Sequence, residues 1–283
     1  MDNISIIEVF ISGRRIGRMA LTPEGMCGFE YDADWIQTGF SISPFYLPLK
    51  SGLIMAKRDP FGGNFGVFDD SLPDGWGNLL LDRYLQERGI DPYKLNILER
   101  LSLIGSTGRG ALEYYPDKSV VTDAEYLNFD SLAKEVAKIL ESKESKGSVD
   151  LLYKYGGSSG GARPKIFTKV DGREWLVKFK ATNDPVDVGE IEYNYSLLAR
   201  DCGIRMAETR LFDNRYFGVE RFDRAPQGKI HTVSAAGLLH ANYRIPSLDY
   251  SILLKLTLNL TKDMEQVAEM FRLMVFNVLI SNR

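Results

Sequence analysis

The stretch that decides the fold runs from Tyr155 to Lys178 and reads YGGSSGGARPKIFTKVDGREWLVK. Its first part is rich in glycine and serine. Its second part holds two apolar-alternating runs, 166–170 and 174–179, on either side of Asp171-Gly172. An Asp-Gly pair between two such runs is typical of a β-hairpin with a two-residue turn. We therefore predict a glycine-rich loop that leads into a hairpin, with Lys178 in the apolar part of the return strand.

The glycine-rich part is suited to binding an anion, because glycine accepts a positive φ and lets several backbone N–H groups approach one ligand. The charge of Lys178 would complement a triphosphate. The loop matches neither the GxxxxGK[ST] pattern nor a clean GxGxxG. From these residues alone, a mobile linker is therefore an equally good interpretation of the stretch. The residues concerned are Gly156, Gly157, Ser158, Ser159, Gly160 and Gly161.

Length and composition indicate a soluble globular protein of one large or two modest domains. The chain has 283 residues, of which 44% are hydrophobic and 26% charged. The net charge of −3 indicates no overall nucleic-acid-binding surface, and local basic patches remain open. The N-terminus lacks the apolar region of a signal peptide, and no apolar run reaches the roughly 20 residues that span a bilayer. We expect a cytoplasmic protein with no membrane partner.

Cysteine and histidine are too sparse for a disulfide framework or a metal site. Cys27 and Cys202 are the only cysteines, which fits a reducing cytoplasm. His231 and His240 are nine residues apart and have no cysteine or carboxylate pattern beside them. We predict no metal ligands within the chain, and we interpret His231 as an ordinary contact.

Upstream of the glycine-rich stretch, the pattern changes from strands to helices. Alternation of apolar and polar residues predicts strands, and apolar residues spaced 3–4 apart predict helices. Two prolines make 41–49 an extended or edge segment. A domain boundary is expected near 116–123. The predicted elements are strands at 4–11, 16–21, 28–31 and 111–115, and helices at 78–86, closed by Gly89, and 91–103.

Downstream, the pattern predicts an amphipathic helix at 129–142, an exposed connection at 143–147, a helix at 188–202 and strands at 206–211 and 216–222. Two further helices follow at 247–260 and 263–281. The second has the clearest apolar stripe in the chain, which we expect to be core. The stripe consists of Val267, Met270, Phe271, Met274, Val275, Val278 and Leu279.

One carboxylate is a candidate partner for Lys178. Glu192 lies at the edge of the apolar stripe of helix 188–202, which holds Ile191, Tyr195, Leu198, Ala199 and Cys202. A carboxylate at a stripe edge can reach inward, whereas Glu190 points further away. The alternative is that both glutamates are solvated.

Several segments, taken in order, resemble one family. They are FDDSLPDGWG, GSTGRGALEY, SSGGARPK, WLVKF, IEYNYSLLARDCGI, GVERFDR and MFRLMVFNVLISNR. With them the chain resembles the HipA-like serine/threonine kinases, toxins of bacterial type II toxin–antitoxin systems. The resemblance implies an α+β fold. It comprises a β-rich N-terminal subdomain with helices at 1–118, a kinase-like N-lobe with its phosphate loop at 119–222, and the first helices of an incomplete helical C-lobe at 223–283.

The resemblance also implies a site for ATP with Mg²⁺. Lys178 looks like the lysine that contacts the ATP phosphates, and Glu192 like its ion-pair partner. Ser158 aligns with the serine that these kinases autophosphorylate to switch themselves off, and Ser159 beside it is not separable from it. The phosphate-loop positions are Gly160, Gly161, Ala162, Arg163 and Lys165, and the hinge positions for adenine lie in 219–222, with Glu220 and Phe222 as the contacts.

In the family, the catalytic loop follows the segment NVLISNR. No catalytic or metal-binding residue is therefore expected within this chain, and the base aspartate is expected just after Arg283. The segment Thr232-Val233-Ser234 also departs from an acidic pair common in relatives. The resemblance implies that the parent protein phosphorylates a protein substrate, an aminoacyl-tRNA synthetase in known relatives, and itself. The 283 residues alone are expected to be inactive.

The expected partner is a helix-turn-helix antitoxin of the HipB type, through which operator DNA is contacted only indirectly. Two alternatives stay open: a non-catalytic module that binds the antitoxin, and a small-molecule kinase that uses the same ATP residues.

Overall fold

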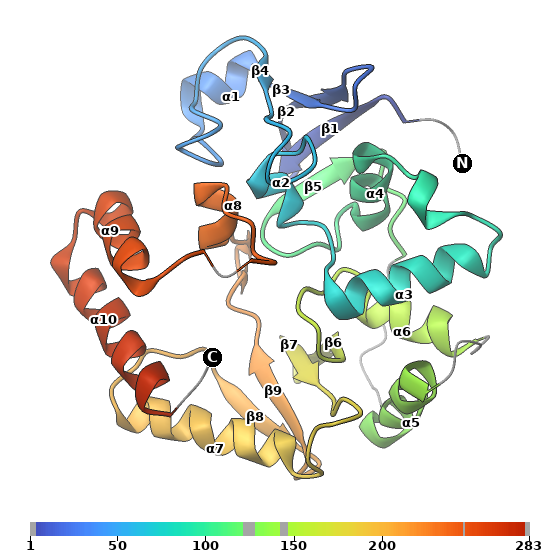
Figure 1. The fold of residues 1–283 in the computed structure, drawn as a ribbon, viewed down its shortest axis with the longest axis vertical. Coiled ribbons are helices and arrows are strands. Elements are labelled where there is room, and N and C mark those ends of the chain that lie inside the picture. The colour runs from blue at the N-terminus through green and yellow to red at the C-terminus, as the bar shows by residue number, and fades with distance from the viewer. Residues whose placement is uncertain (1–3, 121–127, 142–146, 246, 281–283) are drawn as a thin grey trace.

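The computed structural model describes residues 4–120, 128–141, 147–245 and 247–280. Two antiparallel sheets lie one above the other in the view of Figure 1, and the C-terminal helices α9 and α10 stand to one side. Each sheet has its own hydrophobic core. The arrangement is α+β, as the sequence predicted.

The first sheet is built from hairpins near the N-terminus. Its strand order is β4-β3-β2-β1-β5. The turn between β1 and β2 uses Ser12 and Gly13, both with positive φ, which suits the twist of a two-residue hairpin. The predicted strands are confirmed, whereas 41–49 turns back on itself through a bridge between Ser43 and Leu47. The strands are β1 (Ile6–Ile11), β2 (Arg14–Leu21), β3 (Cys27–Tyr31), β4 (Ile54–Met55) and β5 (Leu112–Tyr115).

Two predicted helices of this part differ from the structure. The first begins three residues earlier than predicted, at Gly75, with Asp74 at its N-cap position. The second is interrupted, since the Asn96 side chain accepts the Glu99 N–H and starts a new helix with a capping box. The helices are α1 (Ala33–Thr38), α2 (Gly66–Asp69), α3 (Gly75–Gln86), the 3₁₀ turn η1 (Pro92–Lys94) and α4 (Ile97–Ile104).

The second sheet contains the predicted hairpin. Its strands are β6 (Lys165–Val170), β7 (Arg173–Lys178), β8 (Thr209–Phe212) and β9 (Tyr216–Glu220), in the order β6-β7-β9-β8. Asp171 and Gly172 have φ values of 52° and 76°, as a type I′ turn requires. One face carries the buried Ile166, Trp175 and Val177 in the core formed with α5 (Phe129–Glu141) and α6 (Ser148–Gly156).

Helix α6 was not predicted from the sequence. Its last residue is Gly156, and the Gly157 N–H donates to the Tyr153 carbonyl at 2.9 Å and caps the end. The first two glycines of the expected loop therefore belong to a helix end. The predicted connection at 143–147 lies mostly outside the described residues, as does the last residue of the predicted helix 129–142.

Helix α7 (Val188–Asp201) packs against β8 and β9, with Gly203 beyond its end in a left-handed conformation as expected. The predicted apolar stripe is not the buried face, since Ala199 alone of its five residues is buried. The buried face consists of Gly189, Ser196 and Ala199. Gly189 is required there because an added Cβ would collide with the Arg215 carbonyl oxygen.

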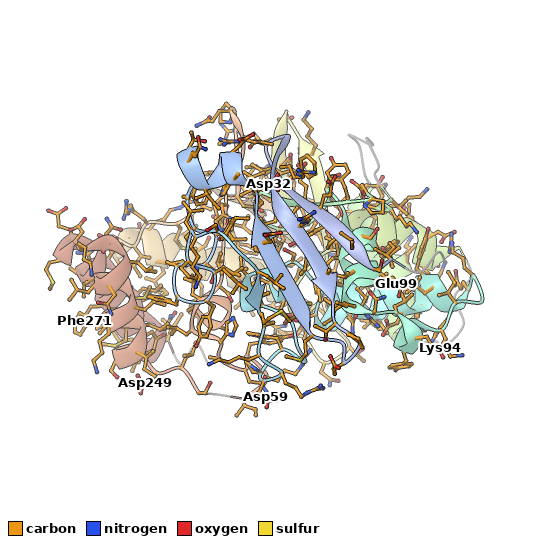
Figure 2. All side chains as sticks on the ribbon, turned by 90° about the horizontal axis from the view of Figure 1, so that it is seen from above. Asp32, Asp59, Lys94, Glu99, Asp249 and Phe271 are labelled. Atoms are coloured by element: carbon orange, nitrogen blue, oxygen red, sulfur yellow. The ribbon has the colours of Figure 1, made fainter. Side chains whose placement is uncertain are left out.

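The C-terminal part contains the hairpin β10 (Arg224–Ala225) and β11 (Gly228–Lys229), and helices α8 (Ala235–Leu239), α9 (Tyr250–Thr261) and α10 (Met264–Leu279). The positions of α9 and α10 confirm the prediction, but the expected core role of the α10 stripe is wrong. Among the described residues of α10 none is buried, and Phe271, Val278 and Leu279 are 51%, 66% and 76% exposed. Figure 2 shows Phe271 at the rim of the molecule. The helix packs on α9, and its side chains also reach Gly203 and Arg205 beyond the end of α7.

Candidate functional site

The glycine-rich loop between α6 and β6 has a buried and an exposed half. Ser158 and Ser159 are buried, whereas Gly161, Ala162 and Arg163 are exposed. Gly161 has a φ of 87°, which only glycine adopts without strain. The exposed half is the part of the loop that can present backbone groups to a ligand.

The N-terminal subdomain holds this loop from one side. The Asp74 carboxylate accepts the Gly161 N–H, and the Trp76 N–H donates to the Gly161 carbonyl at 3.0 Å. The Trp76 indole N–H donates to the Lys165 carbonyl at 3.1 Å. Gly77 lies directly against the Ser159 carbonyl oxygen, where an added Cβ would collide. The start of α3 and the loop therefore form one packed unit.

Two lysine ammonium groups flank the loop. Lys165 and Lys178 face each other across β6 and β7. The Lys165 ammonium donates to the Gly160 carbonyl at 2.6 Å. Burial lowers the pKa of Lys165 to about 8, and the charge of Lys178 acts in the same direction. Lys165 is thus a cation at neutral pH that lacks a carboxylate partner within 4 Å among the described residues.

The ion pair predicted from the sequence is present. The Lys178 ammonium lies 2.7 Å from a Glu192 carboxylate oxygen, and its side chain is 34% exposed. The same ammonium lies 5.2 Å from the centre of the Phe217 ring. Arg163 reaches the other Glu192 oxygen at 3.5 Å and Asp184 at 2.9 Å. Lys178, Glu192 and Arg163 line a cavity of about 350 Å³ between α5, α7 and the end of β7.

The expected hinge lies at the other end of the same strand. Glu220 is paired with Trp175, three residues before Lys178, so the two sites are about 10 Å apart along β7. The Glu220 carboxylate forms an ion pair with Arg173 at 3.4 Å. Phe222 is 69% exposed, and its N–H has no hydrogen-bond partner among the described residues. That backbone donor is therefore available to a ligand.

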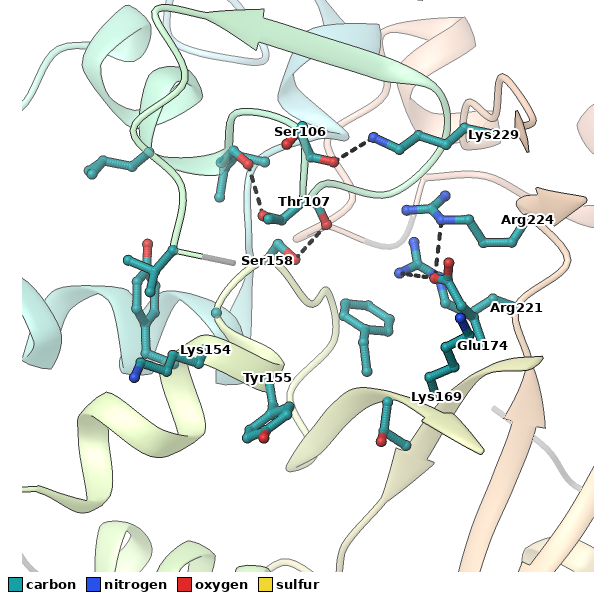
Figure 3. Close-up of a pocket in the computed structure, with 17 residues that line it drawn as sticks. Ser106, Thr107, Lys154, Tyr155, Ser158, Lys169, Glu174, Arg221, Arg224 and Lys229 are labelled. Atoms are coloured by element: carbon teal, nitrogen blue, oxygen red, sulfur yellow. Dashed lines mark hydrogen bonds and ion pairs between the residues drawn. The ribbon is translucent and has the colours of Figure 1, made fainter. Parts of the chain in front are cut away.

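A second cavity, of about 560 Å³, lies between the N-terminal subdomain and the outer edge of β6 (Figure 3). Ser158 points into this cavity, and its hydroxyl donates to the Thr107 carbonyl at 3.0 Å. Lys229 donates to the neighbouring Ser106 carbonyl at 2.6 Å, and Arg224 to the Gly108 carbonyl at 3.0 Å. The loop 106–108 is therefore held from both sides of the cavity.

The charged residues of 221–224, at the end of the expected hinge, form a buried charge cluster that was not predicted from the sequence. Asp223 accepts hydrogen bonds from Arg221 at 2.8 Å, from Arg224 at 2.9 Å and from the Gly110 N–H at 2.8 Å. The Arg221 guanidinium also stacks over the Phe167 ring, 4.2 Å from its centre. Only the density of charges in GVERFDR hinted at it. The cluster connects the expected hinge segment to Gly110 of the N-terminal subdomain.

Both histidines make structural contacts. A ring nitrogen of His231 lies 2.9 Å from the Ile42 carbonyl oxygen. His240 stacks on Tyr46 and accepts the Gly66 N–H at 3.1 Å. Within the described residues, His, Cys, Asp and Glu side chains form no group of three or more that could hold a metal ion. Over the same ranges, no helix has the length and hydropathy needed to cross a bilayer.

Comparisons with known proteins agree with this architecture. Residues 7–115 match the model of the HipA N-terminal domain, and residues 157–283 match that of the HipA-like C-terminal domain. A search of curated proteins returned no match.

Among solved structures, the fold is similar to a chain of the complex of HipA, HipB and operator DNA from the toxin–antitoxin system of Shewanella oneidensis MR-1. The TM-score is 0.66 at 19% identity, over 98% of this chain and 70% of that chain. The chain thus shares its mixed α/β architecture with HipA, which has a kinase-like fold. Since the two family models together match most of the sequence, the chain belongs to the HipA family.

Proposed function

We propose that this chain is the nucleotide-binding part of an ATP-dependent serine/threonine protein kinase, the toxin of a cytoplasmic toxin–antitoxin system. One observation carries the proposal: the 2.7 Å ion pair between Lys178 and Glu192. In protein kinases a strand lysine in such a pair orients the ATP phosphates. The pair lies beside a glycine-rich loop and a second lysine. It is about one nucleotide length from the Phe222 N–H, a donor that has no partner in the described part of the chain.

The residues present fit ATP. Gly160, Gly161, Ala162 and Arg163 would lie over the phosphates, with Lys165 and Lys178 as their counter-charges. Adenine would be bound at the hinge by backbone groups of Glu220 and Phe222. Mg²⁺ would enter with the phosphates, and MgATP supplies the phosphoryl group to be transferred. Glu192 would keep the Lys178 ammonium oriented, and the buried side chains of Phe179 and Tyr216 line the cavity beside it.

We propose Ser158, with Ser159 as the alternative, as the autophosphorylation site. Both hydroxyls are engaged with carbonyl oxygens, Ser158 with Thr107 and Ser159 with Gly156. Because both serines are buried, the loop must move before either can be modified. A phosphate there would add roughly two negative charges beside the place proposed for the ATP phosphates, which would oppose ATP binding.

The test of this proposal is calorimetric titration of the 283-residue chain with MgATP and with MgGTP. We expect saturable binding of MgATP, a raised melting temperature, and no transfer of radiolabel to the chain or to added protein, since no residue of the chain matches the catalytic aspartate of the family. Absence of MgATP binding at millimolar concentration would refute the nucleotide site. Transfer of label would refute the expected inactivity.

A second candidate function is docking of a HipB-like helix-turn-helix antitoxin, with operator DNA contacted only through the antitoxin. The similarity to a chain from a HipA–HipB–DNA complex favours it. Co-purification with the antitoxin, unaffected by changes at Lys178, would support this role separately from nucleotide binding.

A protein substrate should be labelled only by a longer form that carries the catalytic loop. If that form labels small molecules instead, it is a small-molecule kinase.

The lowered pKa of Lys165 predicts a pH dependence of MgATP binding. With a pKa of about 8, Lys165 is cationic at pH 7 and neutral at pH 9.5, while phosphates with a second pKa near 6 stay ionised. We expect the affinity to fall by about tenfold between these pH values. The Lys165→Arg variant remains cationic and should lose this slope. An equal slope in both proteins would assign it to another group.

A further inference from the structure

One carboxylate of the N-terminal subdomain occupies a position where the proposed function places a phosphate. Asp74 lies 87 residues before Gly161 in the sequence, yet its side chain accepts the Gly161 N–H. Asp74 is also the N-cap of α3, but its side chain makes no cap hydrogen bond with that helix. Asp91 and Asp249, in contrast, each accept an N–H of the helix they precede. The Asp74 carboxylate is thus directed at the loop instead of its own helix.

The contact is built into the backbone on both sides. Trp76 donates its N–H to the Gly161 carbonyl, so that Gly161 is bonded through both of its peptide groups to the start of α3. Gly75 packs so closely that an added Cβ would lie 2.6 Å from the Ala162 Cα. Main-chain packing therefore fixes the backbone of Asp74 beside the loop, within reach of its carboxylate.

The same carboxylate acts on the neighbouring lysine. The charge of Asp74 raises the pKa of Lys165 against the larger lowering by burial and by Lys178. An N–H of a glycine-rich loop and a lysine ammonium are the two groups that a nucleotide phosphate uses in such a site. The single negative charge of Asp74 interacts with one group of each kind, the Gly161 N–H and the Lys165 ammonium.

We propose that Asp74 is an internal substitute for a nucleotide phosphate, which caps the glycine-rich loop and must be displaced when a polyphosphate binds. The inference rests on the proposed function, since it concerns the same loop. It assigns to the N-terminal subdomain a direct effect on nucleotide affinity. Any event that pulls the start of α3 away from Gly161 would free the loop for its ligand.

The test compares Asp74→Ala and Asp74→Asn with Asp91→Asn, which alters an N-cap aspartate bonded to its own helix. Calorimetry uses two probes, MgATP and inorganic tripolyphosphate. We expect both Asp74 variants to bind both probes about tenfold more tightly than the wild type, and Asp91→Asn to match the wild type. Amide hydrogen exchange without ligand should be faster at 158–163 in the Asp74 variants alone.

The outcomes separate this inference from the proposed function. Unchanged or weaker tripolyphosphate binding by the Asp74 variants would overturn this inference. The carboxylate would then have no effect on binding, or it would help to shape the loop for its ligand. Tighter tripolyphosphate binding without any MgATP binding would support it and refute the nucleotide proposal. Unchanged amide exchange at 158–163 would overturn it directly, and melting curves show whether each variant is folded.

Discussion

The Lys178→Met variant is expected to bind MgATP about 10- to 100-fold more weakly than the wild type, because a charge-assisted contact to a phosphate contributes roughly 1.5–3 kcal/mol. Methionine keeps the length and the apolar stem of lysine but removes the ammonium. It also leaves Glu192 without its 2.7 Å partner, and its remaining partner Arg163 is further away, at 3.5 Å. Isothermal titration calorimetry at fixed Mg²⁺ measures the effect.

The matched control is Lys169→Met, an exposed lysine on the neighbouring strand β6. It changes the net charge of the same sheet by the same amount, so it accounts for long-range electrostatics. We expect it to bind MgATP within about twofold of the wild type. Equal losses in the two variants would mean that the charge of the sheet, and not the ion pair with Glu192, determines binding.

The Asp223→Ala variant is expected to lose about 3–5 kcal/mol of unfolding free energy, since removal of one member of a buried ionic cluster leaves uncompensated charge. Among the carboxylates of the described residues, Arg221 and Arg224 would keep only the exposed Glu174, at 3.6 Å and 3.3 Å, beside their hydrogen bonds to the Gly108 and Gly110 carbonyls. The Gly110 N–H would lose its acceptor as well. Urea denaturation followed by tryptophan fluorescence gives the difference, with Glu190→Ala on the exposed side of α7 as the near-neutral control.

The pH dependence gives a second check on Asp223. Burial opposes its ionisation, but hydrogen bonds and charges from Arg221 and Arg224 outweigh burial and hold the pKa of Asp223 below its usual value. A depressed pKa stabilises the folded state above the unfolded pKa of about 3.8, and this contribution is lost as the pH falls through the folded value. The stability difference between wild type and Asp223→Ala should therefore shrink below pH 4. A difference that is independent of pH would identify lost packing as its cause.

The hairpin and its lysine could be predicted because their signals are local. Asp171-Gly172 specifies the turn, and alternation then places Lys178 opposite Lys165 with no information from elsewhere in the chain. Helical spacing also predicted Glu192 as the partner of Lys178, although the apolar stripe of helix 188–202 on which that prediction was based is mostly exposed. Its position relative to Lys178 is right because the flank of the stripe, and not its centre, faces the sheet.

The contacts that shape the glycine-rich loop could not be predicted, because their partners are far apart in sequence. Nothing in the sequence around Asp74 and Gly77 indicates a contact with the loop, yet both residues touch it about 80 residues later. Asp223 similarly required the position of the Gly110 N–H. Periodicity reports which face of a helix is apolar, but it does not report whether another element covers that face, as α10 shows.

The uncovered side of α10 affects how the protein must be handled at the bench. Phe271, Val275 and Val278 are exposed on one helix, beside a shallow hollow of about 660 Å³ that is lined by α10, Leu254 of α9 and Cys202. Soluble monomers seldom leave contiguous apolar patches of more than a few hundred Å². A preparation of these 283 residues should adsorb to hydrophobic resins and self-associate as it is concentrated. Titrations belong at low micromolar protein, where ligand binding is not mixed with the heat of aggregation.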